Sequence, residues 1–254
     1  MDPEVRSKGP GKCSKCGMAL EAGIPHPIEY PVEVRATPSR FRPGQKMELA
    51  IRVFDPAKGE PVRRFLVIHE KLFHAFLIGD DLEFFAHEHP VLGSDGVFRL
   101  RIAIPKPGAY RLLCDFYPEG GAPQMIPRTL IFGDYRREIP KLAADLSPKR
   151  SVNLEAVLET EPAQPIAGKK TLLFFKLSPA EGLEPLLGAW GHLLAASDDL
   201  LDTIHTHPFL ADGGPQVQFN MFFPREATYR LWVQFQRKGQ VNTMAFTVPV
   251  SRLR

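Results

Sequence analysis

Two stretches of the sequence carry the same pattern of histidines. "HAFLIGDDLEFFAHEHP" covers residues 74–90 and "HLLAASDDLLDTIHTHP" covers residues 192–208. Each begins with a histidine, contains Asp-Asp-Leu and ends on His-x-His-Pro at the same internal spacing, and together they hold six of the eight histidines. Neutral imidazoles are common ligands of zinc and copper, and three of them are a normal protein ligand set.

The spacing of these histidines suits a metal site at the end of a β-sheet. Side chains alternate between the two faces of a strand, so histidines separated by one residue point the same way. A short connection can bring the earlier histidine of each stretch beside that pair. Three alternatives are open: each set binds one ion, the two sets share one ion, or the histidines merely cap strand ends. The predicted ligands are His74, His87 and His89 in the first set and His192, His205 and His207 in the second.

Two methionines and two acidic pairs are further candidates. Met125 and Met244 stand at corresponding positions near the start of the last strand of each half. A thioether ligand favours Cu(I), and a flexible core-filling role is the alternative. The acidic pairs offer carboxylate ligands, acceptors for the ligands, or ordinary turn residues. These pairs are Asp80-Asp81 and Asp198-Asp199.

Two reactive side chains have apolar counterparts in the other half of the chain. Leu187 stands where the first half has His69, and Val233 stands where it has Cys114. We expect His69 to have a surface role, with an addition to the first set as the alternative. An apolar counterpart predicts that Cys114 is an inert core thiol.

The elements that must position these residues are short strands. The chain contains 20 Gly and 25 Pro, and its apolar residues alternate with polar ones, which is typical of short strands joined by tight turns. About seven strands in each 100 residues predict two tandem antiparallel β-sandwiches, immunoglobulin-like or cupredoxin-like, in an all-β chain. Residues 134–146 are the only, weak, helix candidate. Strands are expected at residues 32–36, 46–54, 64–69, 74–79, 97–104, 110–117 and 128–133, and at residues 152–161, 170–178, 190–197, 217–224, 229–235 and 243–250.

The two halves of the chain align with few gaps, so we interpret the repeat as a domain. Residues 30–135 are predicted to form the first sandwich and residues 151–254 the second, with residues 136–150 as a polar linker. Residues 1–29 contain too few apolar side chains for a core of their own and are expected to form a separate metal-binding segment.

Composition limits the classes of function. With 44% hydrophobic and 24% charged residues the chain is globular. A net charge of +3 with scattered basic residues disfavours nucleic-acid binding. No run of 18 apolar residues is present, so we expect no membrane span. No signal peptide is recognisable either, which leaves the cytoplasm open as a compartment.

The N-terminal segment contains the most specific motif, "MDPEVRSKGPGKCSKCGMAL". Cys13 and Cys16 form a Cys-x-x-Cys pair, which is half of a tetrahedral thiolate site, and Met18 is a soft neighbour. A redox pair is disfavoured because no βαβ pattern surrounds the motif.

This segment resembles the short heavy-metal-binding domain found beside copper-transporting P-type ATPases and in periplasmic adaptors of copper and silver efflux pumps. The block Met1–Glu4 matches the family's Met-His-Pro-Glu, with Asp2 in place of histidine, and Pro10–Leu20 matches Pro-Gly-Lys-Cys-Pro-x-Cys-Gly-Met-x-Leu. The family's first cysteine would precede residue 1, so we expect that residue 1 is not the natural start or was assigned internally. The two halves are similar to sandwich domains of bacterial envelope proteins with "DLxxFxHxHP" and "PGxYRL" signatures.

The resemblance implies a metal-binding protein of the bacterial cell envelope, periplasmic, that acts as a carrier, buffer or sensor for copper or zinc. A metal-efflux component or another envelope protein is the implied partner. The first alternative is an interaction module that binds protein or sugar through its loops. A metalloenzyme is the weakest alternative, since Gly-x-Ser-x-Gly, His-Glu-x-x-His and P-loop patterns are absent from the sequence.

Overall fold

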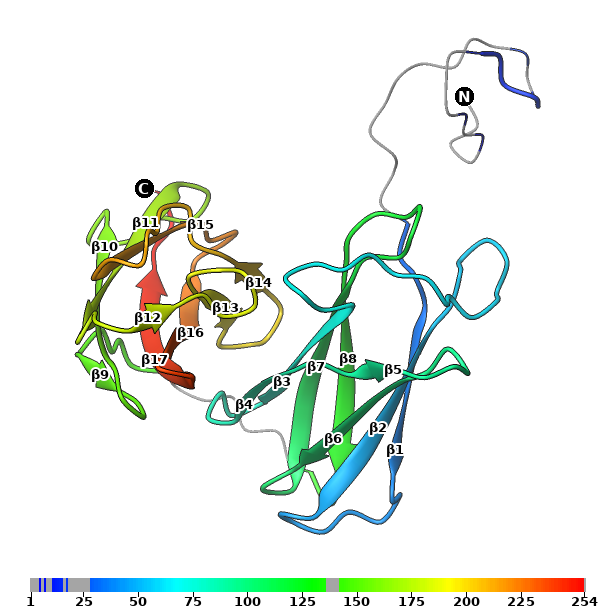
Figure 1. The fold of residues 1–254 in the computed structure, drawn as a ribbon, viewed down its shortest axis with the longest axis horizontal. Helices are drawn as coiled ribbons and strands as arrows, with labels where there is room; N and C mark the ends of the chain where they lie inside the picture. The colour runs from blue at the N-terminus through cyan, green and yellow to red at the C-terminus, as the bar shows by residue number, and fades with distance from the viewer. Residues whose placement is uncertain are drawn as a thin grey trace.

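The computed structural model describes residues 5, 7, 11–15, 17, 28–135 and 142–253. All elements of these residues are β-strands (Figure 1). They form two tandem sandwiches of antiparallel sheets, which confirms the predicted fold class. Within the described ranges, no helix has the length and apolarity that crossing a membrane requires.

The first repeat consists of two four-stranded sheets that face each other. One has the strand order β1-β2-β6-β5 and the other β4-β3-β7-β8. Their inner faces enclose an apolar core that includes Leu49, Phe73 and Leu112. The strands are β1 (Val32–Thr37), β2 (Lys46–Val53), β3 (Phe73–Gly79), β4 (Phe85–Glu88), β5 (Val91–Leu92), β6 (Phe98–Ala103), β7 (Gly108–Phe116) and β8 (Gln124–Phe132).

The second repeat has the same arrangement. One sheet has the order β15-β11-β10-β9, and the other has the order β12-β16-β13-β14 with β17 paired to β16. Leu173, Phe219 and Leu231 lie in the core between them. The strands are β9 (Lys149–Arg150), β10 (Glu155–Glu161), β11 (Lys170–Ser178), β12 (Leu183–Glu184), β13 (His192–Ser197), β14 (Thr203–Thr206), β15 (Gln216–Phe222), β16 (Ala227–Arg237) and β17 (Gln240–Val250).

Strands β3 and β13 are buried on both of their faces. The sequence FHAFLIG of β3 and the sequence HLLAAS of β13 are almost continuously apolar, and every residue of both strands is buried. A strand with alternating burial, such as β2, has one face in water. The inner face of β3 therefore packs in its own sandwich, while its outer face needs a second partner.

That partner is the other repeat. Phe76 and Ile78 of β3 join Leu194 and Ala196 of β13 in one buried cluster, which also contains Trp232 of β16. The outer face of the sheet β4-β3-β7-β8 thus packs on the equivalent face of the second repeat. In Figure 1, β3 and β4 lie on the side of the first repeat that is turned toward the second. Each large apolar side chain buried there contributes roughly 1.5–3 kcal/mol.

The rings of Phe85 and Trp232 are nearly parallel across this boundary. Their centroids lie 5.0 Å apart at an interplanar angle of 7°. The pair joins the β4 region of one repeat to the centre of β16 in the other.

Two predicted elements differ in the structure. Residues 64–69 form no strand, because Phe65 makes only a single bridge, to Pro118, and the chain already turns back at Ile68, which bridges to Lys71. Residues 85–88, which were not predicted as a strand, form β4. The helix candidate falls partly on residues 136–141, outside the described residues. Its described part is not helical, and Asp145 pairs with Thr247 instead.

Candidate metal centre

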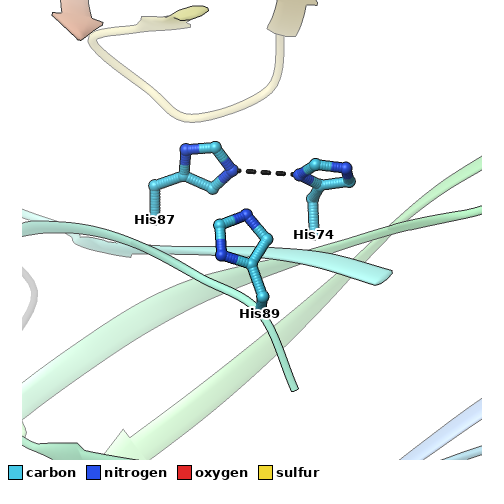
Figure 2. Close-up of side chains that lie close together, drawn as sticks. All are labelled: His74, His87 and His89. Atoms are coloured by element: carbon cyan, nitrogen blue, oxygen red, sulfur yellow. Dashed lines mark hydrogen bonds between the residues drawn. The ribbon is translucent and has the colours of Figure 1, made fainter. Parts of the chain in front are cut away.

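The first histidine set comes together at one end of the sheet β4-β3-β7-β8. His74 lies at the start of β3, His87 lies in β4, and His89 follows β4 directly. One nitrogen from each ring can be chosen so that the three lie within 4.8 Å of one another. Figure 2 shows the rings of His87 and His74 facing each other, with His89 beside them. Since β3 and β4 pair antiparallel with Phe76 opposite His87, the three side chains share one face of the sheet.

The acceptors beside His74 and His87 assign a proton to one nitrogen of each of these two rings. His74 donates Nε2–H to the carbonyl oxygen of Ile68 at 3.0 Å. His87 donates Nδ1–H to Oε1 of Gln234 at 2.7 Å. In the neutral rings, the lone pairs are then on Nδ1 of His74 and Nε2 of His87. These two atoms lie 3.2 Å apart and point at each other (Figure 2).

Two facing lone pairs repel each other, and a cation between them removes that repulsion. Two nitrogens bound tetrahedrally to zinc at 2.0–2.1 Å lie roughly 3.3 Å apart, which is close to the spacing of His74 and His87. Nε2 of His89 is buried and has no hydrogen-bond partner among the described residues. Buried polar atoms are normally paired, so this nitrogen is the third donor that the set could offer to a cation.

The second set brings the equivalent three histidines together, but here the strand-initial His192 faces His207, the counterpart of His89, instead of the counterpart of His87. His192 begins β13, His205 lies in β14, and His207 follows β14, and their ligand nitrogens also lie within 4.8 Å. His192 donates Nε2–H to the carbonyl oxygen of Leu186 at 2.8 Å, and its Nδ1 lies 3.0 Å from Nε2 of His207. Nε2 of His205 is buried and, within the described part of the chain, unpaired.

A tight turn before β3, and an equivalent turn before β13, supply the carbonyl that orients the first histidine of each set. Ile68 and Lys71 exchange two backbone hydrogen bonds, of 2.8 and 3.1 Å, around His69 and Glu70. Both of these residues have positive φ, 47° and 63°, which is the type I′ turn that favours right-twisted hairpins. The same turn occurs in the second repeat between Leu186 and Ala189.

The acceptors for His87 and His205 come from the opposite repeat. His87 bonds to Gln234 of β16, and His205 donates Nδ1–H to Oδ2 of Asp115 of β7 at 2.7 Å. Asp115 pairs with His74 across β3 and β7, and Gln234 pairs with His192 across β13 and β16. Asp115 and Gln234 therefore occupy equivalent positions of the two repeats. Neither was predicted from the sequence.

The two sets lie side by side across the boundary. Ring centroids of His87 and His192 are 5.5 Å apart, and those of His74 and His205 are 6.0 Å apart. Phe76 touches one histidine of each set, with centroid distances of 4.3 Å to His87 and 4.7 Å to His205. The six histidines thus form one cluster at the junction of the repeats.

Burial keeps the imidazoles of His74, His87, His89, His192 and His207 neutral at physiological pH. Because burial disfavours the charged form, it lowers the pKa of each of five histidines below the ordinary value of 6.5, and neighbouring histidines add to this effect. Neutral rings are the form that binds a metal ion. The pKa is lowered to about 2 for His87 and His207, to about 3 for His192 and to about 4 for His89, and it is also lowered for His74.

His69, for which a surface role was expected, is partly buried beside the second set. Its ring stacks on that of His207 in the second set, with centroids 3.7 Å apart and planes at 29°, and it lies 5.6 Å from the ring of His192. The turn that orients His74 therefore places His69 of the first repeat against the second set.

The predicted equivalence of Met125 and Met244 is wrong. Met125 pairs with Asp115, whereas Met244 pairs with Val233, the counterpart of Cys114. The hairpins that precede the two methionines differ in length, which shifts the register by one residue. Met244 consequently points into the core of the second repeat, away from the histidine face. Met125 lies on the histidine face, where its sulfur accepts a hydrogen bond from Thr203 Oγ1 at 3.9 Å.

The acidic pairs lie in turns at the opposite end of β3 and β13 from the histidines. Asp81 accepts the backbone N–H of Glu83, and Asp199 accepts that of Leu201. Lys106 and Arg225 form ion pairs with these carboxylates, so the turn role is the one they have. Cys114 is fully buried, and burial raises the pKa of its thiol to about 12, as expected for an inert core thiol.

The N-terminal motif is described only in part. Cys13 is buried, and its carbonyl oxygen accepts the N–H of Gly17 at 2.8 Å, which closes a turn. Cys16 and Met18 lie outside the described residues, so the ligand role of Cys13, Cys16 and Met18 stays a prediction.

Comparison with protein families identifies the building blocks of the chain. The family described as "Domain of unknown function (DUF8832)" matches residues 29–130 and again residues 151–252. The family described as "Heavy metal binding domain" matches residues 1–22. The predicted heavy-metal-binding segment and tandem domains are confirmed to this extent. No curated protein matches the chain.

Solved structures similar to this chain are distant. FdeC, an Escherichia coli adhesin, is 16% identical with a TM-score of 0.28, over 87% of this chain and 64% of that one. The Yersinia pseudotuberculosis adhesin InvE is 13% identical with a TM-score of 0.26, over 85% and 58%. An Escherichia coli alpha-2-macroglobulin is 12% identical with a TM-score of 0.30, over 89% and 24%. This chain spans less than two thirds of the length of each.

Proposed function

Since this chain belongs to the DUF8832 domain family, which it contains in two tandem copies, we propose that it is a metal-binding protein whose two histidine sets hold zinc or copper. The facing lone pairs of His74 and His87, 3.2 Å apart, carry this proposal. Their other nitrogens are occupied by acceptors, so neither ring can donate to the other. A carbonyl or amide that fixes the far side of a ligand imidazole is also typical of protein metal sites.

The imidazole ligands favour a metal ion of intermediate softness. Each set offers three imidazoles, which suit Zn²⁺ and Cu²⁺, whereas Cu(I) prefers sulfur ligands. Met244 points away from the histidines, so the thioether argument for Cu(I) loses one of its two residues. We therefore rank divalent zinc and copper above Cu(I) at these sets.

The match of the heavy metal binding family to residues 1–22 supports a second place of metal contact. Thiolates of Cys13 and Cys16 would hold a soft ion there. Together with the histidine sets, this segment favours a carrier, buffer or sensor that binds metal without turnover. A bacterial periplasm or cell envelope, with a metal-efflux component as partner, is the setting that we propose.

Elemental analysis of the purified chain after dialysis against zinc or copper tests the proposal. We expect bound metal at the histidine sets, with the loss of about one ion in His87→Ala/His89→Ala and of about one ion in His205→Ala/His207→Ala. Glu159→Gln, an exposed change on β10, is the matched control and should bind as much metal as the parent. Unchanged uptake in both double variants would contradict the proposal.

Exposed apolar side chains support the interaction module as a second candidate. Val67 is 63% exposed and Phe209 is 64% exposed, and each lies a few residues from a histidine set. Exposed large apolar residues near a site often mark a protein partner. Binding of a partner that survives both double histidine variants would favour this candidate over metal binding.

A further inference from the structure

The contacts that orient His87 and His205 cross between the repeats in both directions. His87 of the first repeat is held by Gln234 of the second, and His205 of the second repeat is held by Asp115 of the first, each at 2.7 Å. Each acceptor stands opposite the strand-initial histidine of its own repeat. Each repeat therefore completes the surroundings of the other repeat's set.

Building on the metal-binding function above, we propose that the two sets are halves of one interdomain centre for two ions, in which the second set binds more tightly because a carboxylate holds His205 and only an amide holds His87. The ligands of the two halves are identical in type. Their acceptors are not, since Asp115 carries a negative charge and Gln234 is neutral.

The charge of the acceptor acts on the ligand through its hydrogen bond. A carboxylate that accepts the N–H of a ligand histidine makes the other nitrogen a stronger donor to the metal, and changes to such partners typically alter metal affinity 10–100-fold. The side chain of His205 is only 6% exposed and that of Asp115 only 25%, so water screens their interaction weakly. Oε1 of Gln234 offers His87 the same geometry without the charge.

The closeness of the sets makes them one centre. Four pairs of rings, one ring from each set, have centroids between 5.5 and 6.4 Å apart. Phe76 contacts His87 and His205 together. Ions held by the two sets would be neighbours and would bind the two sandwiches to each other.

Two isosteric substitutions separate charge from geometry. Asp115→Asn keeps an acceptor for His205 but removes the charge, and Gln234→Glu adds a charge beside His87. Zinc affinities are measured by chelator competition in the full chain, with His87→Ala/His89→Ala to report the second set and His205→Ala/His207→Ala to report the first. We expect the second set to bind about tenfold tighter or more.

The substitutions should act on opposite sets. Asp115→Asn should weaken the second set by about tenfold, and Gln234→Glu should strengthen the first set by a similar factor. Asp115 also lies near the first set, so part of its field acts on both, but the hydrogen bond reaches His205 alone. Glu159→Gln controls for a change of net charge. Equal affinities of the two sets, or substitutions that move both sets equally, would overturn the inference.

Electron paramagnetic resonance of the parent chain loaded with Cu²⁺ tests adjacency without any substitution. The first equivalent should give the spectrum of an isolated ion, and the second should add dipolar broadening and a half-field transition. A second equivalent that merely doubles the first spectrum would overturn the single centre while leaving metal binding intact. Failure of the parent chain to take up Cu²⁺ or Zn²⁺ at the histidines would instead overturn the proposed function.

Discussion

The two repeats carry the same three histidines but surround them differently. In both, the strand-initial histidine donates Nε2–H to a carbonyl of a two-residue turn, Ile68 in one and Leu186 in the other. The acceptors that cross between the repeats differ, however, as Asp115 holds His205 and Gln234 holds His87. Local geometry is thus common to the two copies, while the residues that face the other copy have diverged. Pairing of the two copies therefore gives two histidine sets with unlike surroundings.

The largest expected effect comes from removing the packing that brings the two copies together. Trp232→Ala deletes a side chain that is 2% exposed and stacks on Phe85, so we expect a loss of roughly 3–5 kcal/mol in the free energy of unfolding. Urea unfolding measures this loss when it is monitored by far-ultraviolet circular dichroism, a signal that does not rely on tryptophan fluorescence. Phe209→Ala, at an exposed site, should change stability by less than about 0.5 kcal/mol. A loss below about 1 kcal/mol for Trp232→Ala would mean that the repeats do not pack this way.

Metal should stabilise both copies, and each set should contribute separately. Zinc at 100 times its dissociation constant raises the free energy of unfolding by about 2.7 kcal/mol for each site. Thermal unfolding with zinc and with a chelator is the measurement. The parent should gain more than His205→Ala/His207→Ala, which keeps only the first set. Equal gains in the two proteins would show that the second set does not bind.

The turns that precede β3 and β13 differ in backbone strain, and this difference predicts a smaller effect on stability. Glu70 has φ 63° where the second repeat has Gly188 at φ 74°. Because non-glycine residues are disfavoured in this region, Glu70→Gly should stabilise the metal-free protein and Gly188→Ala should destabilise it, each by roughly 1 kcal/mol. Thermal unfolding in the absence of metal measures both changes in stability. The same sign for the two substitutions would contradict the assignment of equivalent turns.

His69 gives the smallest expected effect. His69→Leu places the second repeat's residue in the first and removes the stack on His207, which is worth about 1 kcal/mol. We expect the zinc affinity of the second set to fall by less than about fivefold, with two ions still bound. Loss of a whole ion would instead make His69 a ligand.

The two clusters of histidines were predictable from the sequence because their signal is local. Histidines two residues apart share a face of any strand, and the same spacing occurs in both halves of the chain. The contact between the repeats also left a signal, since FHAFLIG and HLLAAS lack the alternation of a half-exposed strand. Two-sided burial of these strands was the available clue to a second packing surface.

The acceptors and the turn could not be predicted in the same way. Asp115 is 90 residues from His205, and alternation indicates only that it points away from Cys114, not what it meets. His69-Glu70 contains none of the Gly or Asn residues that mark a type I′ turn, so the segment reads as a strand. Met125 and Met244 were interpreted as equivalent because a change in the length of the preceding hairpin does not alter the sequence spacing within the strand that follows it.

Anomalous diffraction at the zinc absorption edge, from crystals of the full chain grown with zinc, tests the central claim most directly. Two strong peaks are expected at the junction of the repeats, one bonded to His74, His87 and His89 and the other to His192, His205 and His207. Nδ1 of His74 and of His192 should be the bonded atoms, since Nε2 donates to a carbonyl in each. No peak at the junction, with the histidines bonded only to one another or to water, would contradict the account.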